Sequence, residues 1–161
     1  SLSKKMGEEI LDLYYKLWGL PYVNLRYFNV YGEKMNLEGA YKLVIPIFAQ
    51  QILEGKPLTI NNDGEQRRDF TYVGDVVKAN ILAALHKDKL NGESFNIGNG
   101  DNYSVNELAD MFGGIKSYGN KVLEPFQTLA DNTKAQKKLG WNPQGDLATW
   151  IKKYKKTLNL K

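Results

Sequence analysis

The chain has 161 residues, of which 42% are hydrophobic and 25% charged, and its formal net charge is +4. This length is typical of one globular domain with a sizeable core. The absence of cysteine excludes disulfides and thiolate metal sites, and the presence of a single histidine, His86, excludes zinc sites built from three histidines. No apolar run approaches the roughly 20 residues that cross a bilayer. We therefore predict a cytoplasmic protein with no membrane partner.

The positive charge is concentrated in the last part of the chain, where residues 116–161 hold ten lysines and three acidic residues. Such a basic end is compatible with binding a polyanion. The alternative is an ordinary solvated surface. Because the lysines are spread over helical faces and are not interleaved with aromatic residues, we predict no nucleic-acid partner.

The first predicted element is a helix over about 4–18, followed by a strand over 22–28. The helix is indicated by apolar residues that share one face at helical spacing: Met6, Ile10, Leu13, Tyr14 and Leu17. The strand is indicated by alternation, and residues 29–33 are expected to form a loop. A second helix is expected over 43–54, ending at Gly55.

The middle of the chain predicts two short strands, 58–60 and 69–73. They flank the turn signal at 62–64, so we expect them to form a hairpin-like pair. Asp75 is positioned to N-cap a helix that runs to about His86.

The last third predicts one strand and three helices. The strand covers 94–98, and Ser104 with Glu107 forms a capping box at the start of the next helix, which ends near Gly113. The two remaining predicted helices span about 132–139 and, capped by Asp146, about 147–158. Strands that alternate with helices in this way indicate an α/β fold.

Several residues have side chains suited to binding an anion or a ligand. The turn Gly98-Asn-Gly100 resembles a phosphate-binding turn, but the third glycine is absent, which favours a simple strand-to-helix turn. Arg67 and Arg68 follow a turn and form a candidate anion site; alternatively, Arg68 is exposed and pairs with Asp69. Asn29 at the end of a strand is either a ligand-binding residue or a turn former.

In chain order, five segments resemble motifs of the extended short-chain dehydrogenase/reductase family, specifically its nucleotide-sugar epimerases and dehydratases. They are Leu2-Ser-Lys-Lys-Met-Gly-Glu-Glu9, Leu25-Arg-Tyr-Phe-Asn-Val-Tyr-Gly32, Arg68-Asp-Phe-Thr-Tyr-Val-Gly-Asp75, Phe95-Asn-Ile-Gly98, and Leu129-Ala-Asp-Asn-Thr-Lys-Ala135 with Leu139-Gly-Trp141. The resemblance implies the C-terminal half of such an α/β protein. It consists of the last strands and helices of the Rossmann sheet and a small mixed α/β substrate-binding domain. Residues 1–161 form this substrate-binding portion, with 1–32 and about 75–98 at the edge of the nucleotide-binding domain.

The resemblance also implies an activity, namely NAD-dependent 4-epimerisation of a UDP-linked hexose or N-acetylhexosamine. In the family's Tyr-x-x-x-Lys pair, the tyrosine falls immediately before Ser1 and the lysine falls on Lys4. We therefore expect the Gly-rich NAD-binding half and the catalytic tyrosine to precede this chain. A lysine beside the tyrosine favours the phenolate, which accepts the proton of the sugar 4-hydroxyl while NAD accepts hydride. The family also suggests a homodimer to which the helix over 4–18 contributes.

The family's site residues transfer to specific positions of this chain. The resemblance implies that Lys4 acts in catalysis and contacts NAD together with Tyr27 and Val30. The residues that it implies for the nucleotide sugar are Asn29, Val44, Thr59, Asn61, Arg68, Lys121, Glu124 and Thr128. No metal site is implied.

Two of these positions depend on local details. Residues 121–124 read Lys-Val-Leu-Glu where the family usually has Arg-Pro-Gly followed by an acid, so Lys121 supplies charge without a bidentate fork, while Glu124 is expected to meet a ribose hydroxyl. Thr128 is small, which leaves room for an N-acetyl group on the sugar. Alternatively, Thr128 only begins a turn, and Phe126 or Gln127 fills that space.

Two other functions stay open. One is a nucleotide-sugar 4,6-dehydratase, but the sequence Tyr-Phe-Asn-Val-Tyr-Gly at 27–32 differs from the Ser-Asn-Asn-Tyr-Gly typical of dehydratases and favours an epimerase. The other is a non-catalytic nucleotide-sugar-binding module. In either case, we predict that this chain alone neither binds NAD tightly nor converts nucleotide sugars.

Overall fold

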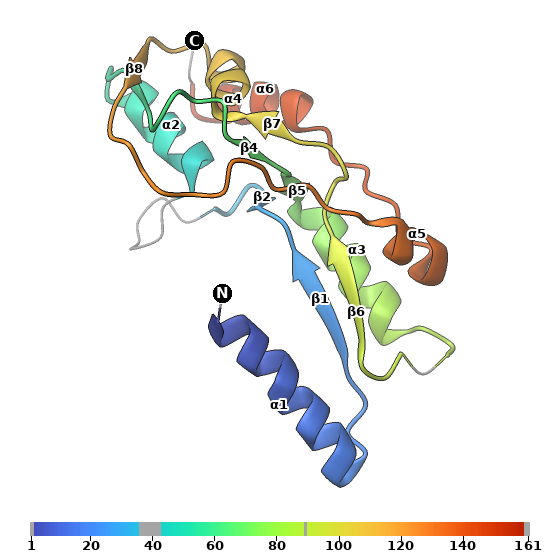
Figure 1. The fold of residues 1–161 in the computed structure, drawn as a ribbon. Helices are drawn as coiled ribbons and strands as arrows, with labels where there is room; N and C mark the ends of the chain where they lie inside the picture. Colours follow the sequence, from blue (N-terminus) through green and yellow to red (C-terminus); the bar gives the residue numbers. More distant parts are fainter. Residues whose placement is uncertain (1, 36–42, 89, 160–161) are drawn as a thin grey trace.

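The structure is a computed structural model that describes residues 2–35, 43–88 and 90–159 (Figure 1). Its helices are α1 (Leu2–Trp18), α2 (Val44–Leu53), α3 (Val73–Ala84), α4 (Val105–Phe112), α5 (Thr133–Leu139) and α6 (Leu147–Thr157). Its strands are β1 (Val23–Tyr27), β2 (Val30–Tyr31), β3 (Leu58–Ile60), β4 (Arg67–Arg68), β5 (Thr71–Tyr72), β6 (Glu93–Ile97), β7 (Tyr103–Ser104) and β8 (Lys116–Tyr118). The expected α/β class is confirmed.

The strands pair two by two. Strands β1 and β6 are parallel, with Leu25 opposite Phe95, and the pairs β2–β5 and β3–β8 are parallel as well. Only β4 and β7 pair in the antiparallel direction among the described strands. Because parallel strands need a crossover, the chain between partners passes through helices, as Figure 1 shows for β1, α3 and β6.

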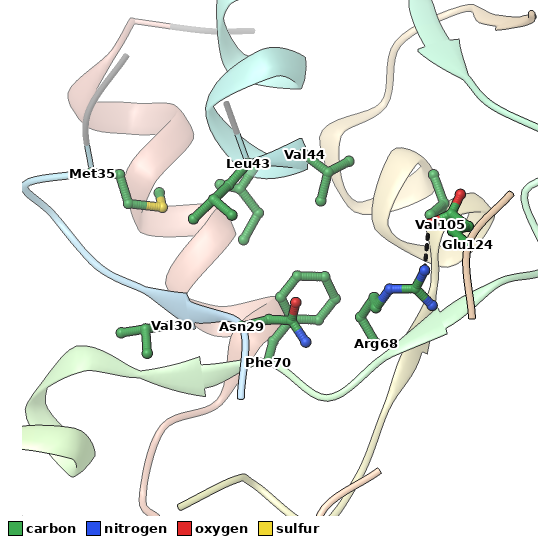
Figure 2. Close-up of a pocket in the computed structure, with 10 residues that line it drawn as sticks. Asn29, Val30, Met35, Leu43, Val44, Arg68, Phe70, Val105 and Glu124 are labelled. Carbon is green, nitrogen blue, oxygen red and sulfur yellow. Dashed lines mark hydrogen bonds and ion pairs between the residues drawn. The ribbon is translucent and has the colours of Figure 1, made fainter. Parts of the chain in front are cut away.

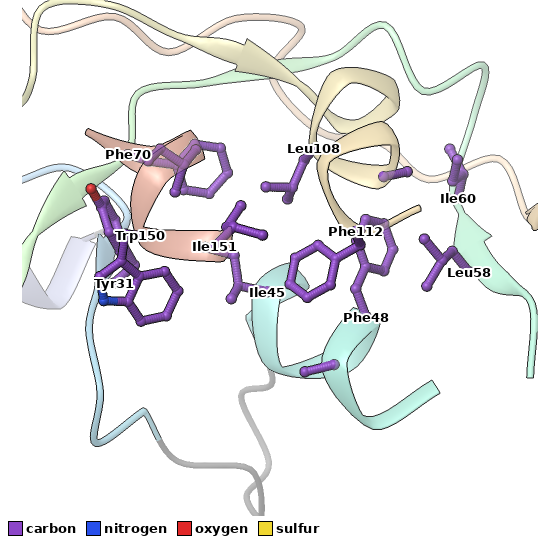
Figure 3. Packing of buried hydrophobic residues seen from close by; sticks show 13 residues of the cluster. Tyr31, Ile45, Phe48, Leu58, Ile60, Phe70, Leu108, Phe112, Trp150 and Ile151 are labelled. Carbon is purple, nitrogen blue, oxygen red and sulfur yellow. The ribbon is translucent and has the colours of Figure 1, made fainter. Parts of the chain in front are cut away.

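One hydrophobic core lies between β3 and the helices α2, α4 and α6 (Figure 3). Phe48 of α2 and Phe112 of α4 meet edge to face, with ring centroids 5.9 Å apart. Tyr31 and Phe70 extend this core toward the strand pair β2–β5. The core therefore joins elements that are far apart in the chain.

A second core lies between the strand pair β1–β6 and the helices α3 and α5. Phe95 and Ile97 of β6 are fully buried in it, as is Trp141. The indole nitrogen of Trp141 donates a 2.8 Å hydrogen bond to the carbonyl of Asp75 in α3. The buried residues thus form two separate clusters, and the division into a sheet portion and a substrate-binding unit stays a prediction.

Helix α1 lies beside β1 and has no buried residue (Figure 1). It is attached mainly by polar contacts: Glu8 receives two hydrogen bonds from Arg26, and Asp12 accepts one from Tyr22. Its predicted apolar face is at the surface, with Met6 at 51% exposure and Leu17 at 59%. No helix in the described part of the chain is both long and apolar enough to cross a membrane.

The predicted helix signals in the last third are confirmed. Ser104 and Glu107 form the capping box of α4, and Gly113 ends that helix in the left-handed conformation. The Asp146 side chain accepts a hydrogen bond from the backbone of Thr149 and caps α6.

Three expectations for the middle of the chain are wrong. The strands expected at 58–60 and 69–73 do not form a hairpin-like pair, because β3 pairs with β8 and β5 with β2. Of the strand expected over 69–73, only β5 at 71–72 forms; Asp69 and Phe70 are not in a strand, and Val73 already belongs to α3. Asp75 lies inside the first turn of α3 and is not its N-cap; its carboxylate instead accepts hydrogen bonds from backbone groups near the start of α6.

Candidate functional site

A cavity of about 200 Å³ lies where the end of β1, the start of α2 and strand β4 meet (Figure 2). Most of its wall is apolar, and three polar side chains converge on it. The lining residues are Asn29, Val30, Met35, Leu43, Val44, Ile45, Arg68, Phe70, Val105 and Glu124. An apolar cavity with a few convergent polar groups is typical of a small-molecule site.

Arg68 is the cationic group of this cavity, and its side chain is only 14% exposed. One terminal nitrogen of its guanidinium donates to the carbonyls of Arg67, at 2.8 Å, and Phe126, at 3.4 Å. The other forms an ion pair with the carboxylate of Glu124. The alternative pairing of Arg68 with its neighbour Asp69 is therefore wrong.

Glu124 is held from its other side by two amide groups. The side chains of Asn62 and Gln66 each donate a hydrogen bond of 3.3 Å to the same carboxylate oxygen. Gln66 is buried and also donates to the carbonyl of Asn61, at 3.0 Å. The carboxylate that faces Arg68 is thus fixed by residues of the β3–β4 connection.

Asn29 connects β1 to the segment that carries Arg68. Its side-chain nitrogen donates a 2.8 Å hydrogen bond to the carbonyl of Asp69, and its own carbonyl accepts from Thr71 at 3.2 Å. Asn29 therefore both shapes a turn and lines the cavity, so the two interpretations of this residue are compatible.

Asp69 explains why the turn at 98–100 is not a phosphate site. Its fully buried carboxylate accepts hydrogen bonds from the backbone nitrogens of Asn99, Gly100 and Ala130, at 2.7 to 3.0 Å. Burial raises the pKa of Asp69, and these three backbone groups oppose the rise. Since the protein's own carboxylate occupies the donors of this turn, the structure agrees with a simple connecting turn.

Arg67 does not line the cavity and is held by hydrogen bonds and an ion pair within the protein. Its guanidinium donates to the side chain and the carbonyl of Asn102, both at 2.8 Å, and lies 2.9 Å from the carboxylate of Glu107. Of the two adjacent arginines, only Arg68 lines the cavity.

The structure brings together about half of the residues predicted for the site. Five of them line the cavity: Asn29, Val30, Val44, Arg68 and Glu124. Lys4 and Tyr27 line a different cavity of about 480 Å³ between α1 and β1, and the Tyr27 hydroxyl donates to Asn80 at 3.0 Å. The roles of these residues stay predictions.

The other four predicted residues, Thr59, Asn61, Lys121 and Thr128, line neither cavity. The backbone and hydroxyl of Thr59 are both hydrogen-bonded by the side chain of Gln51. The Thr128 hydroxyl accepts a 3.4 Å hydrogen bond from the backbone of Asp69.

Phe126, one of the two residues expected to fill the space beside Thr128, is 65% exposed. Both interpretations of Thr128 stay predictions.

Sequence reasoning missed the two amide residues that hold Glu124. The sequence indicates Asn62 only as part of a turn, and its φ of 55° agrees with that role. Nothing around Gln66 in the sequence indicates a buried side chain, because it lies between charged residues. The only available signal was its position two residues before Arg68.

A model of the NAD dependent epimerase/dehydratase family matches residues 1–98. The paired parallel strands, the flanking helices and the arginine-lined cavity next to the end of β1 agree with that match. The chain belongs to this family.

The similar proteins include several sugar-nucleotide epimerases. The chain is 42% identical over 159 residues to a putative UDP-glucose 4-epimerase of Methanocaldococcus jannaschii, covering 94% of this chain and 50% of that protein. Among solved structures, UDP-glucuronic acid 4-epimerase of Bacillus cereus with UDP-glucuronic acid and NAD superposes with a TM-score of 0.85 at 32% identity, covering 95% of this chain and 50% of the other. UDP-glucose 4-epimerase of Thermotoga maritima with UDP-glucose superposes equally well at 34% identity, covering 98% of this chain and 53% of the other. The chain thus spans about half the length of these relatives.

Proposed function

We propose that this chain is the substrate-binding portion of an NAD-dependent 4-epimerase that acts on a UDP-linked hexose or N-acetylhexosamine. The proposal is supported by the family membership and by similar proteins whose names are those of UDP-sugar 4-epimerases. The complete enzyme requires a second half that supplies the dinucleotide fold and the catalytic tyrosine, in agreement with the half-length coverage.

The observation that carries the proposal is the position of Arg68 in an otherwise apolar cavity. Arginine has five N–H groups, and the contacts of Arg68 use three of them. The remaining two have no acceptor among the described residues and are available to a diphosphate, which arginine binds bidentately.

The size of the cavity is consistent with part of a nucleotide sugar. Its volume of about 200 Å³ is below the range of a complete small-molecule site. We assign the diphosphate and the sugar to the cavity beside Asn29 and Val44. In this arrangement, the nucleoside extends along β3 toward Thr59 and Asn61, with Lys121 at its margin and Thr128 beside the 2-substituent of the sugar.

We assign the residues predicted for NAD to its nicotinamide end. Lys4 and Tyr27 face one cavity between α1 and β1, and Val30 lies at the wall of the Arg68 cavity. Within the described residues, the backbone donors of the turn at Gly98 are used by Asp69, so the pyrophosphate of NAD has no cradle there. When bound, NAD supplies a hydride acceptor. The lysine ammonium of Lys4 would hold the proton-accepting tyrosine of the other half as a phenolate.

The exposed apolar face of α1 supports the proposed homodimer. Half-exposed residues at helical spacing, such as Ile10 and Leu13, form a surface suited to packing against another helix. In this proposal, α1 contributes to the contact between two copies of the complete enzyme.

The proposed function is tested with Arg68→Ala in the complete protein. Losing a charge-assisted contact should weaken UDP-sugar binding by about 1.5–3 kcal/mol, measured by calorimetry. Arg67→Ala is the matched control, because Arg67 lies on the same strand but outside the cavity. Unchanged affinity in folded Arg68→Ala protein would refute the site, and a 4-keto-6-deoxy sugar as product would identify a dehydratase.

A further inference from the structure

The ion pair between Arg68 and Glu124 places opposite charges side by side on the wall of one cavity (Figure 2). The Arg68 side chain is 14% exposed and that of Glu124 28%, so water screens the pair only in part. An anion that binds to Arg68 therefore also approaches the negative charge of Glu124. This repulsion opposes the attraction that Arg68 supplies.

The carboxylate of Glu124 has little freedom to move out of the way. One of its oxygens accepts from both Asn62 and Gln66, and the other accepts from Arg68. Since each carboxylate oxygen accepts about two hydrogen bonds, one acceptor position is left, on the oxygen next to Arg68. A ligand that brings a hydroxyl beside its phosphate satisfies both residues, whereas a bare anion satisfies only Arg68.

Asn62 keeps the segment of Glu124 in position. Its side-chain amide donates to the carbonyl of Val122 at 3.2 Å and accepts from the nitrogen of Val122 at 2.9 Å. Asn62 does so from a left-handed backbone conformation, with φ of 55°, which asparagine adopts more readily than most residues other than glycine. Its hydrogen bonds hold the segment that carries Glu124 beside the β3–β4 connection.

We propose that Glu124 is a specificity-determining residue that lowers the affinity of the cavity for inorganic polyanions and thereby selects diphosphates that carry a neighbouring hydroxyl, such as a nucleoside diphosphate. The inference rests on the proposed function, because it takes Arg68 as the residue that binds the diphosphate. It adds that the same site discriminates by repulsion as well as by attraction.

The test compares two probes, inorganic pyrophosphate and UDP, in the complete protein without divalent cations. Glu124→Gln removes the charge but keeps the size of the side chain. We expect pyrophosphate to bind at least about fivefold tighter, because the repulsion is lost. UDP affinity should stay within about twofold, because the lost hydroxyl acceptor offsets the lost repulsion. The preference for UDP over pyrophosphate should therefore fall.

Glu107→Gln is the matched control for this change. Glu107 pairs with the neighbouring Arg67, lies outside the cavity, and as glutamine still completes the capping box of α4. It alters the net charge of the protein by the same amount as Glu124→Gln. We expect it to leave the preference for UDP over pyrophosphate unchanged.

A second variant keeps the inference testable if Glu124→Gln is poorly folded. Asn62→Gly retains the left-handed backbone but deletes the hydrogen bonds of Asn62 to Val122 and Glu124, while the hydrogen bond from Gln66 stays. Glu124 is then freer to move away, and pyrophosphate should bind about two- to fivefold tighter. Asn159→Gly, at a φ of 54° at the end of α6, controls for the backbone effect.

Three results would overturn the inference. The first is an unchanged preference for UDP over pyrophosphate in both variants. The second is an equal loss of affinity for both ligands, which would make Glu124 only a positioning residue for Arg68. The third is an equal gain of affinity for both ligands. If the unaltered protein bound no UDP at all, the proposed function would fail and this inference with it. Binding of UDP with an unchanged preference would remove only the inference.

Discussion

Replacing Asp69 by asparagine tests how the segment that carries Arg68 is held. The Asp69 carboxylate is fully buried and accepts three backbone hydrogen bonds. One oxygen receives the nitrogens of Gly100 and Ala130, and the other receives that of Asn99. An asparagine that keeps its oxygen in the first position must direct its NH₂ group at the nitrogen of Asn99, where donor opposes donor.

The magnitude follows from these contacts. Losing one hydrogen bond to a charged acceptor costs about 1.5–3 kcal/mol, and leaving the partly buried N–H of Asn99 without a partner costs up to about 1–3 kcal/mol. Desolvation of its buried charge raises the pKa of Asp69. Because the asparagine amide is uncharged, it avoids this desolvation cost, and that gain offsets part of the loss. We therefore expect a net decrease of about 2–4 kcal/mol in the free energy of unfolding.

The assay is urea unfolding at neutral pH, with the m-value checked for two-state behaviour. Asp101→Asn, an exposed acidic residue in the same connection, is the control for a change of charge alone. A decrease below about 1 kcal/mol for Asp69→Asn would show that the turn at residues 98–100 needs no carboxylate acceptor and would refute this reasoning.

Three further predictions concern the core, a helix cap and the sugar pocket. Phe112→Ala, in the core against Phe48, should lower the free energy of unfolding by about 3–5 kcal/mol in urea titrations, and a loss below about 2 would contradict the packing shown. Hydrogen bonds from Thr149 hold the pKa of Asp146 below its ordinary value of 3.8, so its stabilisation of α6 is present above that pH and is lost as pH falls through the lower folded value. Asp146→Asn should keep the cap but remove this acid dependence from stability curves; an unchanged acid dependence would exclude Asp146 as its source. In the complete enzyme, Thr128→Tyr should abolish turnover of UDP-N-acetylhexosamines and spare UDP-hexoses; equal turnover of both would remove Thr128 as the gate.

Local signals in the sequence predicted the helices of the last third well. Ser104 and Glu107 interact within one helical turn, and the same holds for Asp146 and the backbone of Thr149. Interactions over three residues depend on the neighbouring residues alone, so they are encoded where they occur. The prediction of a hairpin after β3 was wrong, because a turn signal does not indicate which distant strand supplies the partner.

The candidate site also has features that the sequence predicted and features that only packing decided. The resemblance of the segment 68–75 to a family motif pointed to Arg68, and the structure places Arg68 at a cavity together with Asn29 and Val44. The partner of Arg68 was not predictable from its neighbours, because Asp69 is directed into the turn at residues 98–100. Only packing shows which of two adjacent charged residues faces a cavity.

By itself, the sequence determined the α/β class, the helix ends marked by Ser104, Gly113 and Asp146, and the identity of the charged group that the cavity would contain. The tertiary structure alone decided that Glu124, 56 residues further along the chain, faces Arg68, and that Asn62 and Gln66 fix its carboxylate. The physical reason is that capping energies arise between groups a few bonds apart, whereas an ion pair on a cavity wall requires that separate strands first pack together.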